Sequence, residues 1–173
     1  GFKEIAIAGV HLGSYGRDLS PSSSLAGLLR ALADTFPDLL FRISSLEPMD
    51  CTSGIVDLVA TRACFARHFH LPLQHASNRI LVAMRRPYTL ADYAALVERV
   101  REAMPEASLG SDVIVGFPGE SEDDFTELTS YLEQSPLTHL HVFPYSDRTG
   151  TAASRLGGKV GGAVVRERGG RVG

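Results

Sequence analysis

The sequence predicts an α/β fold in which parallel strands alternate with helices. Two observations support this prediction: five short apolar runs recur along the chain, and four segments with helical spacing of apolar residues separate them. The chain has 173 residues, is 44% hydrophobic and carries a net charge of -3. Such a composition can fill a core and argues against a protein whose whole surface binds nucleic acid. No apolar run approaches the roughly 20 residues that span a bilayer.

The chain opens on a strand. Residues 4–10 (EIAIAGV) form a short apolar run that ends near a glycine, which is typical of a strand buried on both faces. Apolar residues within 25–36 then fall on one helical stripe, with a serine before them to cap the helix and Pro37 after them. Residues 39–46 predict the second strand, which a Glu-Pro pair stops.

The middle of the chain repeats this alternation. A short helix begins at Ser53, and residues 68–73 predict the third strand. Two helical segments follow, a turn over 77–84 and a longer helix over 89–104. The longer one begins with a T-x-x-D capping signal at Thr89, which favours a helix start at that position.

The last predicted elements are a strand, a helix and a strand. Residues 108–116 predict the fourth strand, a capping pair beginning at Ser121 starts a helix, and residues 137–145 predict the fifth strand. We expect the glycine-rich segment 157–173 to be a flexible tail, which leaves residues 1–156 as the structured domain. The pattern leaves two architectures open, a doubly wound sheet and an α/β barrel. The first strand is not followed by G-x-G-x-x-G, which disfavours a dinucleotide-binding fold.

Small, polar or glycine residues follow all five predicted strands. Because parallel strands deliver their carboxyl ends to one edge, this pattern predicts a ligand site there. Backbone groups of residues 112–116 can hydrogen-bond a nucleobase while Ile114 packs on it. Glu47, Gln74 and Ser45 carry groups that bind an ammonium or ribose hydroxyls. The alternative is structural: Glu47 only pairs with a nearby arginine, and Gln74 only ties loops together.

The histidines and cysteines do not indicate a metal site. Two pairs of histidines alternate along predicted strands and so share a face: His68 with His70, and His139 with His141. These four could in principle bind zinc. However, no cysteine or carboxylate lies beside them at ligand spacing, so we expect no metal. Cys51 and Cys64 are too far apart for a metal knuckle and read as ordinary buried or loop thiols, as in a cytoplasmic protein.

Two segments place arginine beside an aromatic residue. Residues 84–88 (MRRPY) contain Arg86, and residues 145–151 (YSDRTGT) contain Tyr145 and Arg148. Such groups can hold phosphates and stack a base. The alternative is a solvated helix cap and an ordinary loop.

Five ordered segments resemble the radical S-adenosylmethionine methylthiotransferases. They are 42–48 (RISSLEP), 70–74 (HLPLQ), 84–89 (MRRPYT), 111–120 (SDVIVGFPGE) and 141–146 (HVFPYS). The resemblance extends from Gly1 to about Arg168. It is strongest to the branch that acts on N6-threonylcarbamoyladenosine beside the tRNA anticodon. The segment 74–77 (QHAS) is instead similar to the branch that modifies an aspartate of a small-subunit ribosomal protein. The isopentenyladenosine branch fits less well.

The resemblance implies a fold and cofactors. The fold is a (β/α)6-type partial TIM barrel built around S-adenosylmethionine and [4Fe-4S] clusters. In the family a C-x-x-x-C-x-x-C loop after the first strand holds one cluster, and this sequence has no such motif. We therefore expect the barrel here to be incomplete, lacking its first βα unit, and this chain alone to be inactive.

The resemblance also implies site residues. Those expected to contact S-adenosylmethionine are Gly9, Ser45, Glu47, Gln74, Asp112, Ile114 and Gly116. Those expected on the substrate side are Arg86, Tyr145 and Arg148. No catalytic residue and no metal ligand is assigned within the chain.

The implied function is that of a complete enzyme. It would add a methylthio group to C2 of N6-threonylcarbamoyladenosine, with tRNA and S-adenosylmethionine as partners, as a monomer in the cytoplasm and without a membrane. One alternative is the ribosomal-protein aspartate branch. Another is an unrelated α/β-barrel lyase or aldolase with Glu47 or His75 as acid–base. A non-catalytic RNA-binding module is the last, and the net charge of -3 disfavours it.

Overall fold

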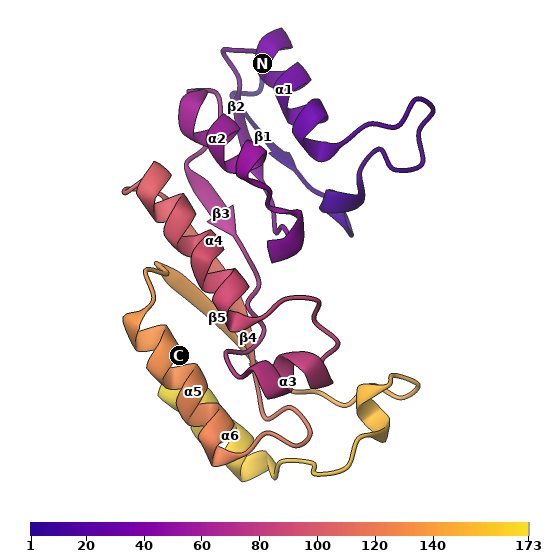
Figure 1. Ribbon diagram of the computed structural model, residues 1–173, viewed down its shortest axis with the longest axis vertical. Coiled ribbons are helices and arrows are strands. Elements are labelled where there is room, and N and C mark those ends of the chain that lie inside the picture. The colour runs from indigo at the N-terminus through magenta and orange to yellow at the C-terminus, as the bar shows by residue number, and fades with distance from the viewer. Residues whose placement is uncertain (173) are drawn as a thin grey trace.

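The computed structural model describes residues 1–172, in which five strands and six α-helices alternate (Figure 1). The strands are β1 (Glu4–Ile7), β2 (Leu40–Ile43), β3 (His68–His70), β4 (Ser108–Val115) and β5 (His139–Pro144). The helices are α1 (Leu25–Thr35), α2 (Ser53–Thr61), α3 (Asn78–Ala83), α4 (Leu90–Ala103), α5 (Glu122–Gln134) and α6 (Gly162–Val172). Short 3-10 turns occupy Leu12–Ser14, Pro48–Asp50 and Ala153–Arg155. No described helix is long and apolar enough to cross a membrane.

All paired strands are parallel and follow one another in chain order. β1 pairs with β2, and β4 lies between β3 and β5. A parallel bridge from Phe41 to Phe65 and a hydrogen bond from Leu46 N to His70 O (3.0 Å) join the two groups. A doubly wound sheet would reverse its strand order, whereas a barrel winds in one direction. The sequential order therefore decides for an open, incomplete α/β barrel.

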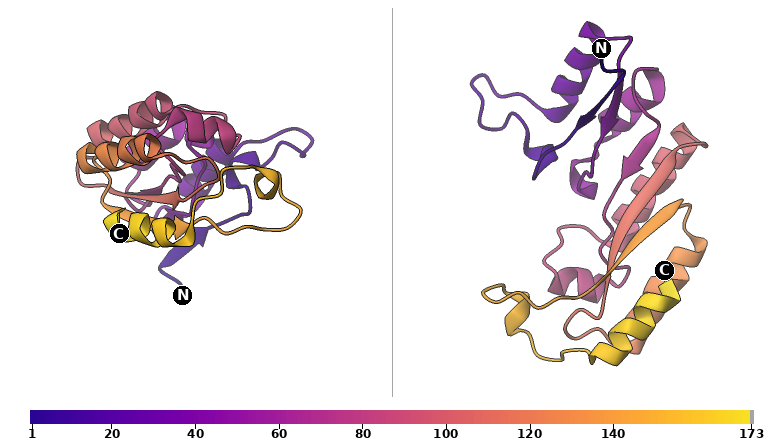
Figure 2. Two further views of the ribbon diagram at one scale, coloured as in Figure 1. Left: turned by 90° about the horizontal axis from the view of Figure 1, so that it is seen from below. Right: turned by 180° about the vertical axis from the view of Figure 1, so that it is seen from behind.

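The core lies between the strands and one row of helices. Alternate strand residues, such as Phe41 on β2 and Phe69 on β3, point toward the helices and are buried. Tyr93 of α4 and Phe125 of α5 meet them in the same cluster. Seen from below, α4 and α5 lie together on one side of the strands (Figure 2, left). The intervening strand residues therefore face the other, concave side and are free for function.

The segment predicted to be a flexible tail is corrected by the structure, because residues 162–172 form α6. This helix packs beside α5 against β5, as Figure 2 shows. Its Arg168 is buried and pairs with Glu120, while Val165 packs on the core. The glycines of the segment disfavour a helix by about 1 kcal/mol each, but buried contacts from distant residues outweigh that local preference.

Both predicted capping signals are confirmed. Thr89 and Asp92 form a capping box at the start of α4, and Ser121 and Asp124 form another at α5. Asp124 also accepts a hydrogen bond from Ser77 Oγ at 2.7 Å.

Asp124 gives the protein an expected acid sensitivity. Burial raises the pKa of this carboxyl, but hydrogen bonds from Arg79, Ser121 and Ser77 outweigh that effect and hold the pKa well below its ordinary value. A carboxyl whose pKa is lower in the folded state stabilises the fold at pH values above its unfolded-state pKa, which is near 3.9. This stabilisation is lost as the pH falls below that value toward the folded-state pKa. We expect Asp124→Asn to cost about 2 kcal/mol of unfolding free energy at neutral pH, with the gap to the unmodified protein narrowing below about pH 4.

Urea denaturation at a series of pH values measures this gap. Asp123→Asn is the matched control, since Asp123 is the exposed neighbour on the same helical turn. A gap for Asp124→Asn that stays constant down to acid pH contradicts the expected linkage.

Candidate functional site

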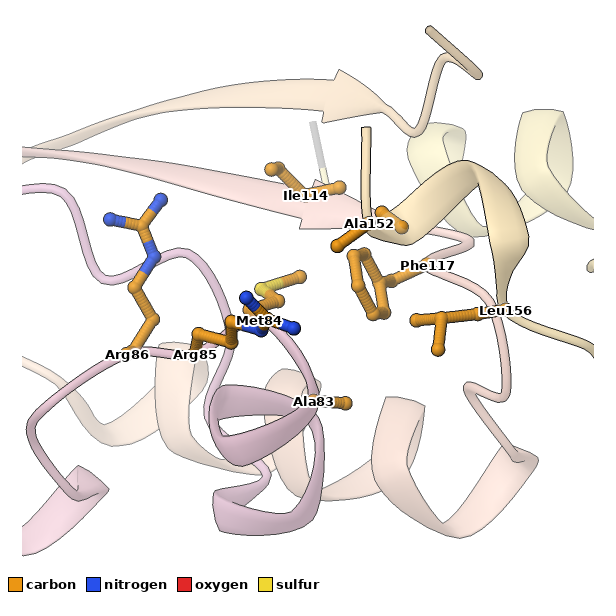
Figure 3. A pocket seen from close by; sticks show the side chains of 9 residues that line it. Ala83, Met84, Arg85, Arg86, Ile114, Phe117, Ala152 and Leu156 are labelled. Atoms are coloured by element: carbon orange, nitrogen blue, oxygen red, sulfur yellow. The ribbon is translucent and has the colours of Figure 1, made fainter. Parts of the chain in front are cut away.

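A cavity of about 250 Å³ lies at the carboxyl end of β4 (Figure 3). Three segments line it: the end of β4 with Ile114 and Phe117, the turn after α3 with residues 83–86, and the 3-10 turn with Ala152, Ala153 and Leu156. Figure 3 shows Ile114 beside the end of β4, with Met84 and Phe117 among the other side chains that line the cavity. Pockets that bind small molecules usually have volumes of about 300 Å³ or more, and this cavity is slightly smaller. It can therefore hold part of a nucleoside-sized ligand.

The loop after β4 is held rigidly behind this cavity. Glu120 Oε2 accepts hydrogen bonds from the backbone N of Gly116 (2.8 Å) and of Phe117 (3.3 Å). Glu120 Oε1 lies 2.5 Å from Arg168 Nη1. Burial raises the pKa of Glu120, while His75, Arg168 and the Gly116 amide together hold it below its ordinary value. Glu120 is therefore a buried carboxylate that fixes the position of Phe117.

Gly116 cannot readily be another residue. Its φ of +79° lies in the left-handed region, where a side chain is strained. A Cβ at this position would also overlap Cγ2 of Val165 on α6. The glycine predicted at the ligand site thus serves the close approach of α6 to the strand end.

Two non-glycine residues among 1–172 have a positive φ: Arg85 (58°), which lines the cavity, and Gln74 (69°), whose backbone hydrogen-bonds to that of Ile114. Such conformations cost about 1 kcal/mol or more and are found preferentially at functional sites. Gln74 follows β3 and forms an isolated parallel bridge with Val113: its N donates to Asp112 O and its O accepts from Ile114 N, each at 2.8 Å. Its side-chain amide makes no hydrogen bond to another described residue and is half-buried, so it is available to a ligand.

Glu47 and Arg86 form a pair that connects the end of β2 to the cavity. Arg86 Nη1 lies 3.3 and 3.4 Å from the two carboxylate oxygens of Glu47. Pairing with an arginine was the structural alternative for Glu47, and the structure confirms that contact. Arg86 Nε is buried and has no hydrogen-bond partner in the described chain. Beside it, burial raises the pKa of Tyr88 to about 12, and the Tyr88 hydroxyl donates to Leu73 O at 3.1 Å.

Tyr145 borders the same region. Its ring meets Phe117 edge-on, with centroids 5.4 Å apart, and its hydroxyl donates to Asp147 at 2.8 Å. Arg148 is exposed and makes no salt bridge within residues 1–172. Lys159 instead pairs with Asp147 at 2.7 Å.

The remaining predicted residues lie elsewhere. Gly9 borders a separate hollow formed by residues 8–19, and Ser45 is exposed without a side-chain hydrogen bond to a described residue. Asp112 points along the concave face toward His70 and His141 rather than into the cavity. The structure thus places four predicted residues at or beside the cavity: Ile114, Gly116, Arg86 and Tyr145. Glu47 is linked to this group by its ion pair with Arg86, and Gln74 by its backbone hydrogen bond with Ile114.

Several cavity residues were not predicted: Met84, Arg85, Phe117 and Leu156. Met84, Arg85 and Phe117 lie in segments already singled out, so a signal existed for their neighbourhood. The positive φ of Arg85 has no sequence signal, because nothing in the residue type demands it. Leu156 comes from a loop that the alternation of strands and helices does not place.

A family model described as the radical SAM superfamily matches residues 30–132. Curated relatives match nearly the whole chain, 97% of it in each of the three that follow. The threonylcarbamoyladenosine tRNA methylthiotransferase MtaB of Bacillus subtilis is 38% identical, and that of Aquifex aeolicus is 41% identical. The ribosomal protein uS12 methylthiotransferase RimO of Saccharopolyspora erythraea is 41% identical. The chain covers 37%, 40% and 35% of these relatives respectively, well under half of their length.

Solved structures show the same fold at low sequence identity. The radical S-adenosylmethionine methyltransferase TsrM of Kitasatospora setae superposes with a TM-score of 0.64 at 17% identity, over 82% of this chain and 27% of its own. Coproporphyrinogen III oxidase HemN of Escherichia coli gives 0.59 at 21% identity, over 74% of this chain and 30% of its own.

Proposed function

This chain belongs to the radical SAM superfamily, and we propose that the cavity at its strand ends binds S-adenosylmethionine. The observation that carries the proposal is the apolar wall formed by Ile114 and Phe117, in which Glu120 holds the backbone N of Phe117. An adenine ring packs on a flat apolar surface, and the Phe117 ring with the Ile114 side chain offers one. The proposal keeps Ile114 and Gly116 among the residues that contact S-adenosylmethionine.

The polar groups beside the cavity suit the rest of the molecule. S-adenosylmethionine carries an ammonium, a carboxylate and a sulfonium, so a site for it needs both signs of charge. Glu47 supplies a carboxylate and Arg86 a guanidinium whose Nε is still unpaired. The free amide of Gln74 can bind a ribose hydroxyl. Within the proposal, Arg86 binds the cofactor rather than RNA, and Tyr145 and Arg148 stay on the substrate side.

The residues present do not fit an iron–sulfur cluster. Such a cluster is held by cysteine thiolates, and burial raises the pKa of Cys51 to about 12, which keeps it protonated. Cys64 is buried as well, and residues 1–172 contain no third cysteine. We propose that cluster ligands in the whole protein come from outside this chain, and that the chain alone carries out no radical chemistry.

The activity proposed for the whole protein is methylthio transfer. The finer proposal is addition at C2 of N6-threonylcarbamoyladenosine in tRNA, supported by the segments MRRPYT and HVFPYSDRTGT and by the two MtaB relatives. The second candidate substrate is an aspartate of ribosomal protein uS12, favoured by QHAS at 74–77 and by the RimO relative at 41% identity.

Mass spectrometry of cells lacking the gene separates the two substrates. We expect the methylthiolated form of threonylcarbamoyladenosine to disappear from digested tRNA while peptides of uS12 keep their mass. Loss of the modification from uS12 with unchanged tRNA nucleosides would establish the second candidate instead.

Calorimetric titration with S-adenosylmethionine tests the cavity itself. Ile114→Ala removes three carbons from the proposed adenine contact, which at about 0.8 kcal/mol per buried methylene weakens binding by about tenfold or more. Leu132→Ala is the matched control, since Leu132 is a half-buried aliphatic residue of α5 beside a different hollow. Equal affinity of the Ile114→Ala variant and the control would show that the cofactor does not use this cavity.

A further inference from the structure

Four imidazoles gather on the concave face of the sheet, away from the cavity. His68 and His70 lie on β3, His139 and His141 lie on β5, and β4 runs between them. Gly110 of β4 makes room for them: its Cβ would overlap His139 Nε2 and approach His70 Nδ1 to 2.7 Å. The glycine thus permits an unusual concentration of metal-binding side chains.

Asp112 of β4 points into this group. Its Oδ1 lies 2.9 Å from His70 Nε2 and 3.2 Å from His141 Nδ1. One ligand atom from each of the three residues lies within 4.8 Å of the others. Within each single strand, no carboxylate stands at ligand spacing from the histidines. The parallel register brings Asp112 to them: it lies opposite His141 on β5, and it is two residues after Gly110, which lies opposite His70 on β3.

We propose that His70, Asp112 and His141 form a binding site for a divalent transition metal of the zinc type. Two imidazoles and one carboxylate are a known ligand set for such ions. With bonds of about 2.0–2.1 Å in tetrahedral geometry, neighbouring ligand atoms stand about 3.3 Å apart. The observed separations of 2.9 and 3.2 Å from Asp112 are close to this value, so small side-chain shifts accommodate the ion.

The surroundings favour an ion with an open coordination position. His70 is buried, whereas the His141 side chain is 59% exposed, so solvent or a ligand reaches the site from that side. His139 stacks beside His68 with centroids 6.0 Å apart and walls the site.

Other groups in the described chain do not offer the same arrangement. His11 lies 3.0 Å from Asp50, but Arg17 already pairs with that carboxylate at 3.1 Å. His75 is fully buried against Glu120, where Arg168 neutralises the charge. Among residues 1–172, His70, Asp112 and His141 are the group of three that could hold an ion.

Zinc titration of the purified, chelator-treated protein tests the site, with visible absorption of added Co²⁺ as a second readout. We expect the unmodified protein to bind Zn²⁺, and Asp112→Asn and His141→Ala each to weaken binding by more than about tenfold, since even supporting residues of metal sites are worth 10- to 100-fold. His68→Ala is the matched control and should change affinity far less. Asparagine keeps the shape of Asp112, and circular dichroism checks that each variant is folded.

Two results would overturn the proposal. One is that the unmodified protein takes up no Zn²⁺. The other is that folded Asp112→Asn and His141→Ala variants bind as tightly as the His68→Ala control, which would leave the three residues as a hydrogen-bonded group only.

Discussion

Replacing Arg168 by alanine is expected to lower the free energy of unfolding by about 3 to 5 kcal/mol. The Arg168 side chain is only 6% exposed, and it lies 2.5 Å from Glu120 Oε1 and 3.0 Å from Glu122 Oε2. Its guanidinium also lies over the Phe125 ring, 5.1 Å from the centroid. Without it, the buried carboxylate of Glu120 loses its guanidinium partner and keeps only the Gly116 and Phe117 amides and the His75 ring, so a buried ion pair is broken on one side, which is costly.

The matched control for this prediction is Arg171→Ala. Arg171 lies one turn further along α6, pairs with the same Glu122 at 3.3 Å and covers the same Phe125 ring, but its side chain is 49% exposed. An exposed pair contributes about 1 kcal/mol or less. Urea denaturation measures both variants. Equal losses for Arg168→Ala and Arg171→Ala would mean that burial of the Glu120 pair does not matter.

Replacing Gly116 by alanine is expected to cost about 2 to 3 kcal/mol of unfolding free energy and to weaken S-adenosylmethionine binding. Two effects add here: the positive φ of 79° strains any side chain, and the new methyl group overlaps Val165. The overlap pushes α6 away from the strand end or moves the loop that carries Phe117.

Gly150→Ala separates these two effects. Gly150 also has a positive φ, of 89°, but its Cβ would meet nothing within 4 Å. This variant therefore shows the backbone strain alone, about 1 kcal/mol. Thermal and urea unfolding of both variants give the comparison. If Gly116→Ala loses no more stability than Gly150→Ala, the close packing of α6 on the strand end is not a constraint.

Most of the fold could be predicted from the sequence because local and tertiary signals agree. The strand runs around Phe41, Phe69 and Val113 alternate with helices whose starts at Thr89 and Ser121 carry capping boxes, and all these elements are present. The alternation alone leaves a barrel and a doubly wound sheet open, since strand order is not a local property; the resemblance to the methylthiotransferases implied the barrel, and the structure confirms it. The helix around Arg168 was missed for the same reason: its stability comes from Glu120, which is 48 residues away.

The site was predictable where it lies on strand ends and not where it depends on pairing between strands. Ile114 and Gly116 follow from the pattern of β4, and their neighbourhood was anticipated. The gathering of His70 and His141 around Asp112 depends on the register of β3, β4 and β5. The left-handed backbone of Gln74 and Arg85 depends on how each strand end or turn meets its neighbours.

Methyl nuclear magnetic resonance of protein labelled at isoleucine and methionine tests the central claim that the strand ends form one mouth for S-adenosylmethionine. Addition of the cofactor is expected to shift the signals of Ile114 and Met84, which line the cavity. The signal of Ile55, a buried residue of α2, should stay unchanged and serves as the internal reference. Saturable shifts at Ile114 and Met84 support the account. Shifts confined to other residues, or no shifts while the protein is folded, would contradict it.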